Sequence, residues 1–93
     1  MTVLGSQSAT AANVNSSASS VTLFAAVGNA KGRTVYNDSA AVLYLKFGAT
    51  ASTTSYTVQL PAGAYYEFPQ PCYSGVVDGI WASANGAARV TGW

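Results

Sequence analysis

Side chains that could carry out a reaction are scarce in this 93-residue chain. It has three carboxylates, four Lys or Arg residues, one cysteine and no histidine. Acid–base and nucleophilic catalysis both need a titratable partner beside the reacting group, and histidine is the usual base. The three acids, Asp38, Glu67 and Asp78, are isolated in sequence, and the serines and threonines have no histidine to activate them. These residues predict a protein that is not an enzyme and has no catalytic residues.

The residues give no support for a metal, cofactor or nucleic-acid site either. Zinc and calcium sites need clustered Cys and His residues, or acids at Asp-x-Asp spacing, and neither pattern is present. Gly28 and Gly32 lack the Gly-Lys-Ser/Thr ending of a phosphate-binding loop. With a net charge of +1 and four scattered basic residues, the chain has no basic stripe to neutralise phosphates. We therefore expect no metal, no cofactor and no nucleic acid.

The scarcity of charge also says something about the surface. Only 8% of the residues are charged, against about a quarter in an ordinary soluble domain. More than half of the residues are Ala, Ser, Thr, Gly or Asn. Such a surface is easily desolvated, and it does not repel a neighbouring chain as a strongly charged surface would. The composition indicates a subunit of a homo-oligomer or other multi-copy assembly.

Length and cysteine content indicate one small domain held together by packing. Ninety-three residues bury one core, and the lone Cys72 cannot form an internal disulfide. No secretory signal is visible, because the first basic residue is Lys31 and a polar stretch precedes it. The longest apolar run, 40–45, is far shorter than the ~20 residues of a membrane span. We expect neither export by a signal peptide nor a membrane-spanning segment.

The composition changes near residue 19. Residues 1–19 are mostly Ser, Ala, Thr and Asn, and Val3 and Leu4 are among their few large apolar side chains. This composition is typical of an N-terminal arm. A polar arm that cannot pack on itself is usually ordered by something else, so we expect it to dock on a neighbour or to add an edge strand to the domain formed by residues 20–93.

From residue 20 onward, short segments rich in Val, Thr and aromatic residues alternate with Gly, Pro, Asn and Asp. No segment repeats apolar residues at the 3.6-residue period of a helix. Several strands have an inward apolar set that needs a second layer, so the expected fold is all-β: an antiparallel, jelly-roll-like β-sandwich of seven or eight short strands, with a small β-barrel as the alternative. The expected strands are residues 20–27, 33–37, 40–47, 54–60, 64–69, 76–83 and 87–92, with an eighth at 12–17.

The first of two turn signals is Pro-Ala-Gly at 61–63, which predicts a three-residue hairpin that pairs 56–60 with 64–68. One side of this hairpin then faces the core: Tyr56, Val58, Leu60, Ala64, Tyr66 and Phe68. The alternate side faces water: Thr57, Gln59, Tyr65 and Glu67.

The second turn signal is Asn85-Gly86, which predicts a type I′ hairpin between the last two strands. Its inward face holds Val77, Gly79, Trp81, Ala88 and Val90. The opposite face carries two charges and is expected outside, where it forms an apolar patch with a charged rim unless a loop of the same chain covers it. This patch and the arm supply the expected partner contacts: Val3, Leu4, Val76, Asp78, Ile80, Arg89 and Trp93.

The two strands near the start and middle of the domain have similar patterns. Residues 20–27 are expected to bury Val21, Leu23, Ala25 and Val27, and residues 40–47 to bury Ala41, Leu43, Leu45 and Phe47. The aromatic side chains left outside are Phe24, Tyr36, Tyr44 and Tyr65. Surface aromatics most often form cross-strand pairs or interfaces. Because Glu67 lies beside Tyr65, a carbohydrate-binding surface that uses Tyr65, Tyr44 or Trp93 is a second hypothesis.

Three stretches resemble small structural proteins of tailed bacteriophages. They are residues 33–48 (RTVYNDSAAVLYLKFG), 56–69 (YTVQLPAGAYYEFP) and 73–91 (YSGVVDGIWASANGAARVT), and the likeness spans about residues 20–91. The resemblance implies a β-sandwich in the virion, made in the host cytoplasm, whose partner is the major capsid protein or another virion protein. The first hypothesis is a head decoration (cement) protein that stabilises the capsid by binding its outer surface. A neck, tail or baseplate component is the alternative.

Overall fold

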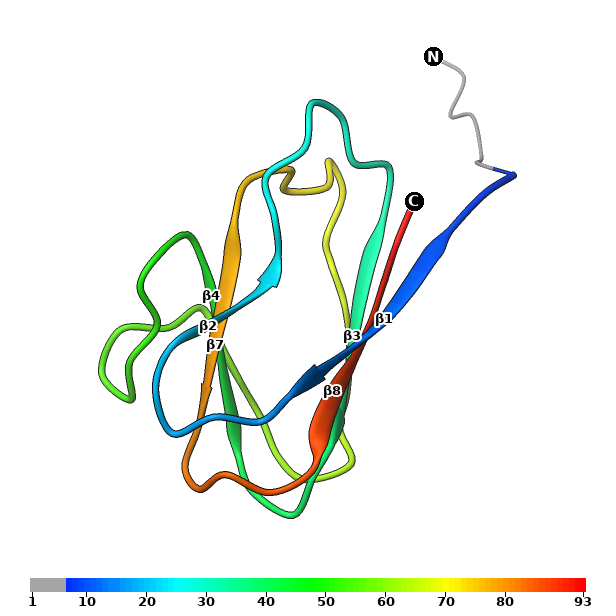
Figure 1. Ribbon diagram of the computed structural model, residues 1–93. Helices are drawn as coiled ribbons and strands as arrows, with labels where there is room; N and C mark the ends of the chain where they lie inside the picture. Colours follow the sequence, from blue (N-terminus) through cyan, green and yellow to red (C-terminus); the bar gives the residue numbers. More distant parts are fainter. Residues whose placement is uncertain (1–6) are drawn as a thin grey trace.

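The computed structural model describes residues 7–93, which form strands and connecting loops without a helix (Figure 1). None of the described segments is therefore a helix able to span a bilayer. The strands of the described chain are β1 (Thr10–Asn15), β2 (Val21–Phe24), β3 (Arg33–Asp38), β4 (Leu43–Phe47), β5 (Val58–Leu60), β6 (Tyr65–Glu67), β7 (Val77–Trp81) and β8 (Ala87–Gly92).

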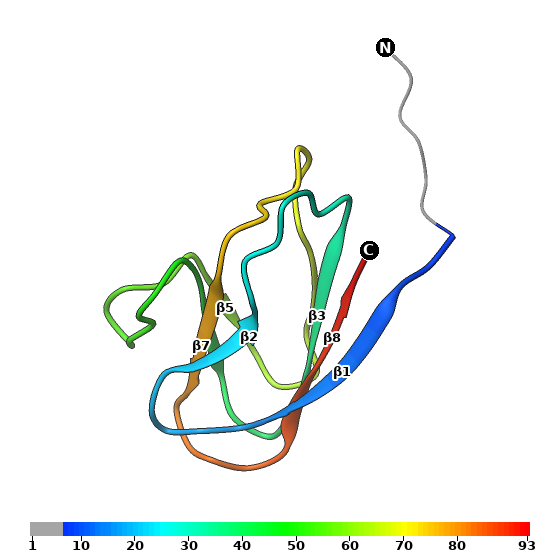
Figure 2. The same ribbon diagram turned by 45° about the horizontal axis from the view of Figure 1, so that its top comes forward.

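The strands form two four-stranded antiparallel sheets that pack face to face (Figures 1 and 2). Sheet A has the order β1-β8-β3-β6, and sheet B has the order β2-β7-β4-β5. The chain pairs like one long ribbon, β1 with β8, β2 with β7, β3 with β6 and β4 with β5. The ribbon is then rolled, so that β8 also pairs with β3 and β7 with β4. This order is that of an eight-stranded jelly roll, and the all-β sandwich predicted from the sequence is confirmed.

The predicted arm contributes a strand to the domain. Residues 10–15 form β1, which pairs with β8 over six consecutive residues, from Thr10 opposite Gly92 to Asn15 opposite Ala87. This is the added edge strand that was one of the two expectations for the arm. Val3 and Leu4 lie outside the described residues.

Both predicted hairpins are wrong. β5 and β6 lie in different sheets, and so do β7 and β8. Gly63 and Gly86 do have positive φ angles, 78° and 73°, but Asn85 does not, so the predicted type I′ turn is also wrong. Each turn nevertheless carries the chain from one sheet to the other. The pairing of a strand is decided by where its apolar side is buried, and a turn signal alone does not make consecutive strands pair. The Asn85 side chain fixes the second crossing by accepting a hydrogen bond at 2.7 Å from the backbone N–H of Ala40.

In most strands the side chains that were predicted to face the core do so. The alternate residues Leu43 and Leu45 of β4, and Val77 and Trp81 of β7, are completely or almost completely buried. They form one core between the sheets with these residues: Leu23, Val35, Ala41, Leu60, Phe68, Ala88 and Val90. Tyr56, which was expected inside, is exposed because its strand begins only at Val58.

The prediction for residues 20–27 is wrong beyond Leu23. β2 ends at Phe24, and Val27 in the following loop is 52% exposed. The register of β2 on β7 shifts between Thr22 and Phe24, which marks a β-bulge. Leu23 and Phe24 both contact the core as a result, and Phe24 packs edge-on against Phe68 with ring centroids 5.6 Å apart. Phe24 is thus not one of the outward aromatics.

A buried asparagine ties the connections β3–β4 and β5–β6 to the core. Asn37 is fully buried, and its Nδ2 donates to the carbonyl oxygens of Ala41, Leu60 and Pro61 at 2.8, 2.9 and 3.1 Å. Its Oδ1 accepts a hydrogen bond from Trp81 Nε1 at 3.2 Å. One amide therefore joins both sheets at this end of the sandwich.

Candidate functional site

The structure separates the residues of the predicted contact patch. Val76, Asp78 and Ile80 belong to β7 or its approach, in sheet B, whereas Arg89 and Trp93 belong to β8 or its end, in sheet A. The prediction that they form one face is wrong, because it rested on the hairpin that the structure does not contain. A contact role for each residue remains a prediction.

Asp78 was expected outside but is buried. Its carboxylate accepts hydrogen bonds from the hydroxyls of Ser20 and Thr22, each at 3.2 Å. Ser20 Oγ also accepts a hydrogen bond at 3.0 Å from the backbone N–H of Ala51, which lies in the loop between β4 and β5. This loop therefore reaches over the outer side of sheet B, and Asp78 is covered by its own chain.

The outer side of sheet A is more open. Neighbouring strands place Asn13, Arg89, Tyr36 and Tyr65 directly opposite one another in a single row across all four strands. Tyr36 is 40% exposed and Tyr65 is 62% exposed. The next row consists of Ala11, Thr91, Thr34 and Glu67. We call these eight residues the tyrosine face.

The tyrosine face offers rings and hydrogen-bonding groups with almost no net charge. Arg89 forms an ion pair with Asp38 at 3.1 Å, so its charge is partly neutralised. Both side chains are about half exposed, and an ion pair of this kind adds little stability. The exposed tyrosine rings, beside amide and hydroxyl groups, suit contact with another protein or with a sugar.

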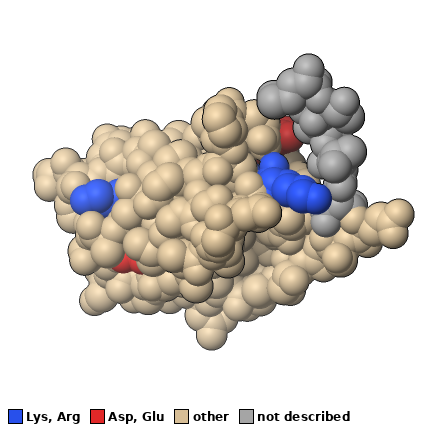
Figure 3. All heavy atoms as spheres, turned by 90° about the horizontal axis from the view of Figure 1, so that it is seen from above, with Lys and Arg blue, Asp and Glu red and all other residues tan. Residues whose placement is uncertain are grey.

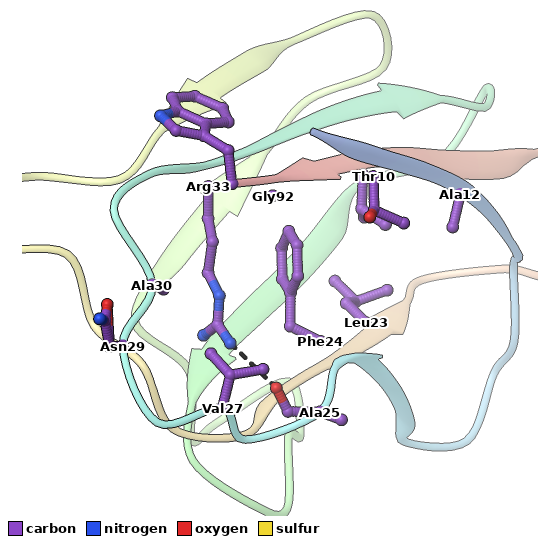
Figure 4. Close-up of a pocket in the computed structure, with 12 residues that line it drawn as sticks. Thr10, Ala12, Leu23, Phe24, Ala25, Val27, Asn29, Ala30, Arg33 and Gly92 are labelled. Atoms are coloured by element: carbon purple, nitrogen blue, oxygen red, sulfur yellow. Dashed lines mark hydrogen bonds between the residues drawn. The ribbon is translucent and has the colours of Figure 1, made fainter. Parts of the chain in front are cut away.

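A second surface feature is an apolar cleft of about 470 Å³ at the side of the sandwich where β1 and β2 form the sheet edges. In Figure 4, Leu23 and Phe24 project into the space below β1, and Val27 and Ala30 of the β2–β3 loop close one end. The remaining lining residues are Thr10, Ala12, Ala25, Asn29, Arg33, Val90, Gly92 and Trp93.

Arg33 is the one charged group in this cleft, and it is only 2% exposed. Its guanidinium donates to the carbonyl oxygens of Ala25, Tyr73 and Gly75 at 2.9, 2.9 and 2.7 Å. It also lies 4.7 Å from the centre of the Phe24 ring. Burial lowers the pKa of Arg33, but an arginine stays charged at any ordinary pH. The guanidinium is already engaged by the backbone and serves to position the loops.

Cys72 lies close to this cluster and is partly buried. Burial raises the pKa of its thiol, and the nearby positive charge of Arg33 opposes that rise. Its Sγ is 3.6 Å from the carbonyl oxygen of Tyr73. A thiol whose pKa is raised is a poor nucleophile at neutral pH, so Cys72 acts here as a small packing residue.

Arg33 and Asn37 were not singled out from the sequence, although a signal was present. Both alternate with Val35, whose type indicates an inward side chain. In a strand, residues two apart share a face, so Val35 would have placed both polar side chains inside.

Between residues 7 and 93, no three His, Cys, Asp or Glu side chains gather as metal ligands would. The chain matches no protein-family model, no curated protein and no solved structure. The fold and the arrangement of the surface are therefore the basis for any assignment of function.

Proposed function

We propose that this protein is a structural component of a tailed-bacteriophage virion, and that it decorates the head by binding the outer surface of the capsid. Its partner is the major capsid protein or another virion protein, and its work is mechanical. Each docked copy adds buried area at a capsid surface, worth about 25 cal/mol per Å² of apolar area before the costs of association.

The observation that supports this proposal is the uncharged exterior of the folded chain. Of the seven charged residues, Arg33 and Asp78 are buried, and Arg89 and Asp38 neutralise one another. The exterior is thus even poorer in charge than the sequence indicates. Figure 3 shows one face on which charged atoms cover only a few small areas among uncharged side chains. A surface of this kind is suited to being covered by another protein.

The fold is compatible with the proposal. Eight-stranded jelly rolls occur among viral capsid domains, and they also occur in lectins and cupins. A fold hosts many functions, so this likeness of architecture supports the proposal only as an analogy.

The proposal predicts that purified particles of a phage encoding this chain contain it in hundreds of copies. Quantitative mass spectrometry of intact particles, with the major capsid protein as internal reference, measures that number. About six or twelve copies per particle would assign the protein to the neck, tail or baseplate instead. Particles without the protein would contradict a virion role of any kind.

A carbohydrate-binding function is the second candidate, and the tyrosine face favours it. Tyr36 and Tyr65 lie directly opposite one another and are exposed, with Asn13 in the same row and Glu67 in the next. The combination of ring faces with carboxylate and amide groups is suited to a sugar. Tyr44 is less suited to stacking on a sugar, because its ring packs edge-on against the ring of Tyr56, with ring centroids 5.1 Å apart.

If the tyrosine face binds a glycan, Tyr65→Ala is expected to weaken binding by about tenfold or more, since stacking on a ring is lost. A glycan array identifies the ligand, and calorimetry on wild-type protein and variant measures the change. Val27→Ala, which alters an exposed side chain in a loop, is the control. No binding across the array would remove this candidate.

A further inference from the structure

The four edge strands of the two sheets are protected unequally. An exposed edge presents unpaired backbone N–H and C=O groups, and proteins usually prevent further pairing with very short strands, charges, prolines or bulges. β5 and β6 have three residues each. Pro61 follows β5 directly, and Glu67 and Pro69 stand at the end of β6. β2 has four residues and contains the bulge.

β1 has none of these protections. It has six residues, Thr-Ala-Ala-Asn-Val-Asn, with no charge, proline or glycine. Its register on β8 is regular along the whole strand. Figures 1 and 2 show β1 at the rim of sheet A, with no other strand on its outer side. Of the edges that the described residues form, this is the one open to another strand.

The alternation of hydrogen bonds shows which backbone groups of β1 face outward. The N–H of Ser16 donates to the carbonyl of Gly86, so residues at even positions of this segment direct their backbone groups toward β8. Ala11, Asn13 and Asn15 therefore direct their N–H and C=O groups away from sheet A. These three residues are exposed.

We propose that this edge pairs with β1 of a second copy of the chain, antiparallel and about a twofold axis, and that the two A sheets join into one continuous sheet. This inference rests on the proposed function in one respect, since it specifies how the copies of a multi-copy component contact one another.

Two observations favour a second copy as the occupant. In an antiparallel pair about a twofold axis, each edge meets a second copy of itself, so a charged edge would meet like charge whereas this uncharged edge does not. The apolar cleft also opens beside β1, and Thr10 and Ala12 are among its lining residues. The inward side chains of an added strand would lie at the mouth of this cleft and cover part of its apolar wall.

The test is the oligomeric state of the purified full-length protein, free of phage particles. Sedimentation velocity and light scattering from about 5 µM to 1 mM are expected to show a dimer. Asn13→Pro removes an outward N–H without removing a bond to β8, so the strand is retained while the dimer dissociates at least about tenfold more readily. A wild-type protein that stays monomeric over the whole range would overturn the proposal.

A second variant keeps the test decisive if Asn13→Pro does not fold. Ala11→Lys with Asn15→Lys places four positive charges along the paired edge and is expected to abolish the dimer. Thr53→Lys with Thr54→Lys, in the exposed loop between β4 and β5, is the matched control and should dimerise like wild type. A dimer that tolerates lysines in β1 would refute pairing at this edge. A protein that is monomeric in solution but present at high copy number on phage heads would contradict only this inference. A protein that dimerises in solution but is absent from phage particles would contradict only the proposed function.

Discussion

The Asn37→Ala protein is expected to lose about 3 to 5 kcal/mol of its free energy of unfolding. The substitution removes three hydrogen bonds donated by the buried amide and leaves the indole N–H of Trp81 without its acceptor. The hydroxyl of Ser39 loses the same acceptor but keeps the carbonyl oxygen of Ala41, at 3.0 Å. A buried polar group left without a partner costs about 1–3 kcal/mol. A domain of this size has about 5–15 kcal/mol in total, so the variant is close to unfolding. Urea denaturation followed by tryptophan fluorescence measures the loss.

Asn13→Ala is the matched control, because Asn13 is an exposed amide on the outer side of sheet A and should change stability by no more than about 0.5 kcal/mol. Asn37→Asp separates hydrogen bonding from packing, since it keeps the shape and places a carboxylate oxygen against three carbonyl oxygens. That repulsion raises the pKa of the new carboxyl in the folded state above its unfolded value of about 3.9. The deficit in stability relative to wild type should therefore be greatest above this raised pKa and shrink as the pH falls through it, because the protonated acid donates a hydrogen bond. An equal deficit at pH 7 and pH 4 would argue against this account.

Local features of the fold were predictable from the sequence. That Leu43 and Leu45 share one face, and Val77 and Trp81 another, depends only on the two-residue period of a strand, and the structure buries these side chains as predicted. The number of strands and the sandwich follow from the same information. β2 was harder to predict, because a bulge changes the face of every residue after it in the strand, and here it accompanies the packing of Phe24 against Phe68.

The pairing of strands was not predictable from local signals. β1 pairs with β8 across almost the whole chain, Thr10 with Gly92, and nothing near either residue indicates the other. Gly63 and Gly86 need a positive φ whether the turn closes a hairpin or crosses to the other sheet. A turn signal fixes where the chain bends, and the burial of both sheets decides where it goes.

The same limit applies to the candidate sites. That Tyr65 and Glu67 point outward was predicted from alternation, and both are exposed. Tyr36 and Arg89 lie in one row with Tyr65 because β3 pairs with both β6 and β8, and the sequence did not indicate this pairing. The cleft depends on β1 and β2, which are the edges of different sheets.

The Arg33→Met protein is expected to lose about 2 to 4 kcal/mol of unfolding free energy, the second largest effect. Methionine keeps much of the side-chain volume, so the loss reports the charged hydrogen bonds to the loops before β3 and before β7. Water entering from the cleft replaces part of them, and the effect is therefore smaller than at Asn37. Chemical denaturation measures the loss, and hydrogen exchange should show faster exchange at residues 25–32 and 72–76.

Arg89→Met is the matched control, because Arg89 is half exposed and its ion pair with Asp38 is worth less than about 1 kcal/mol. Equal losses for the two variants would contradict the proposed role of Arg33. The comparison also bears on why this charge-poor chain keeps a buried arginine. The loops that Arg33 holds have no strand to satisfy their carbonyl groups, and one guanidinium can donate to several carbonyl oxygens at once. A lysine donates from a single nitrogen and cannot span the same carbonyls, so Arg33→Lys should recover only part of what Arg33→Met loses.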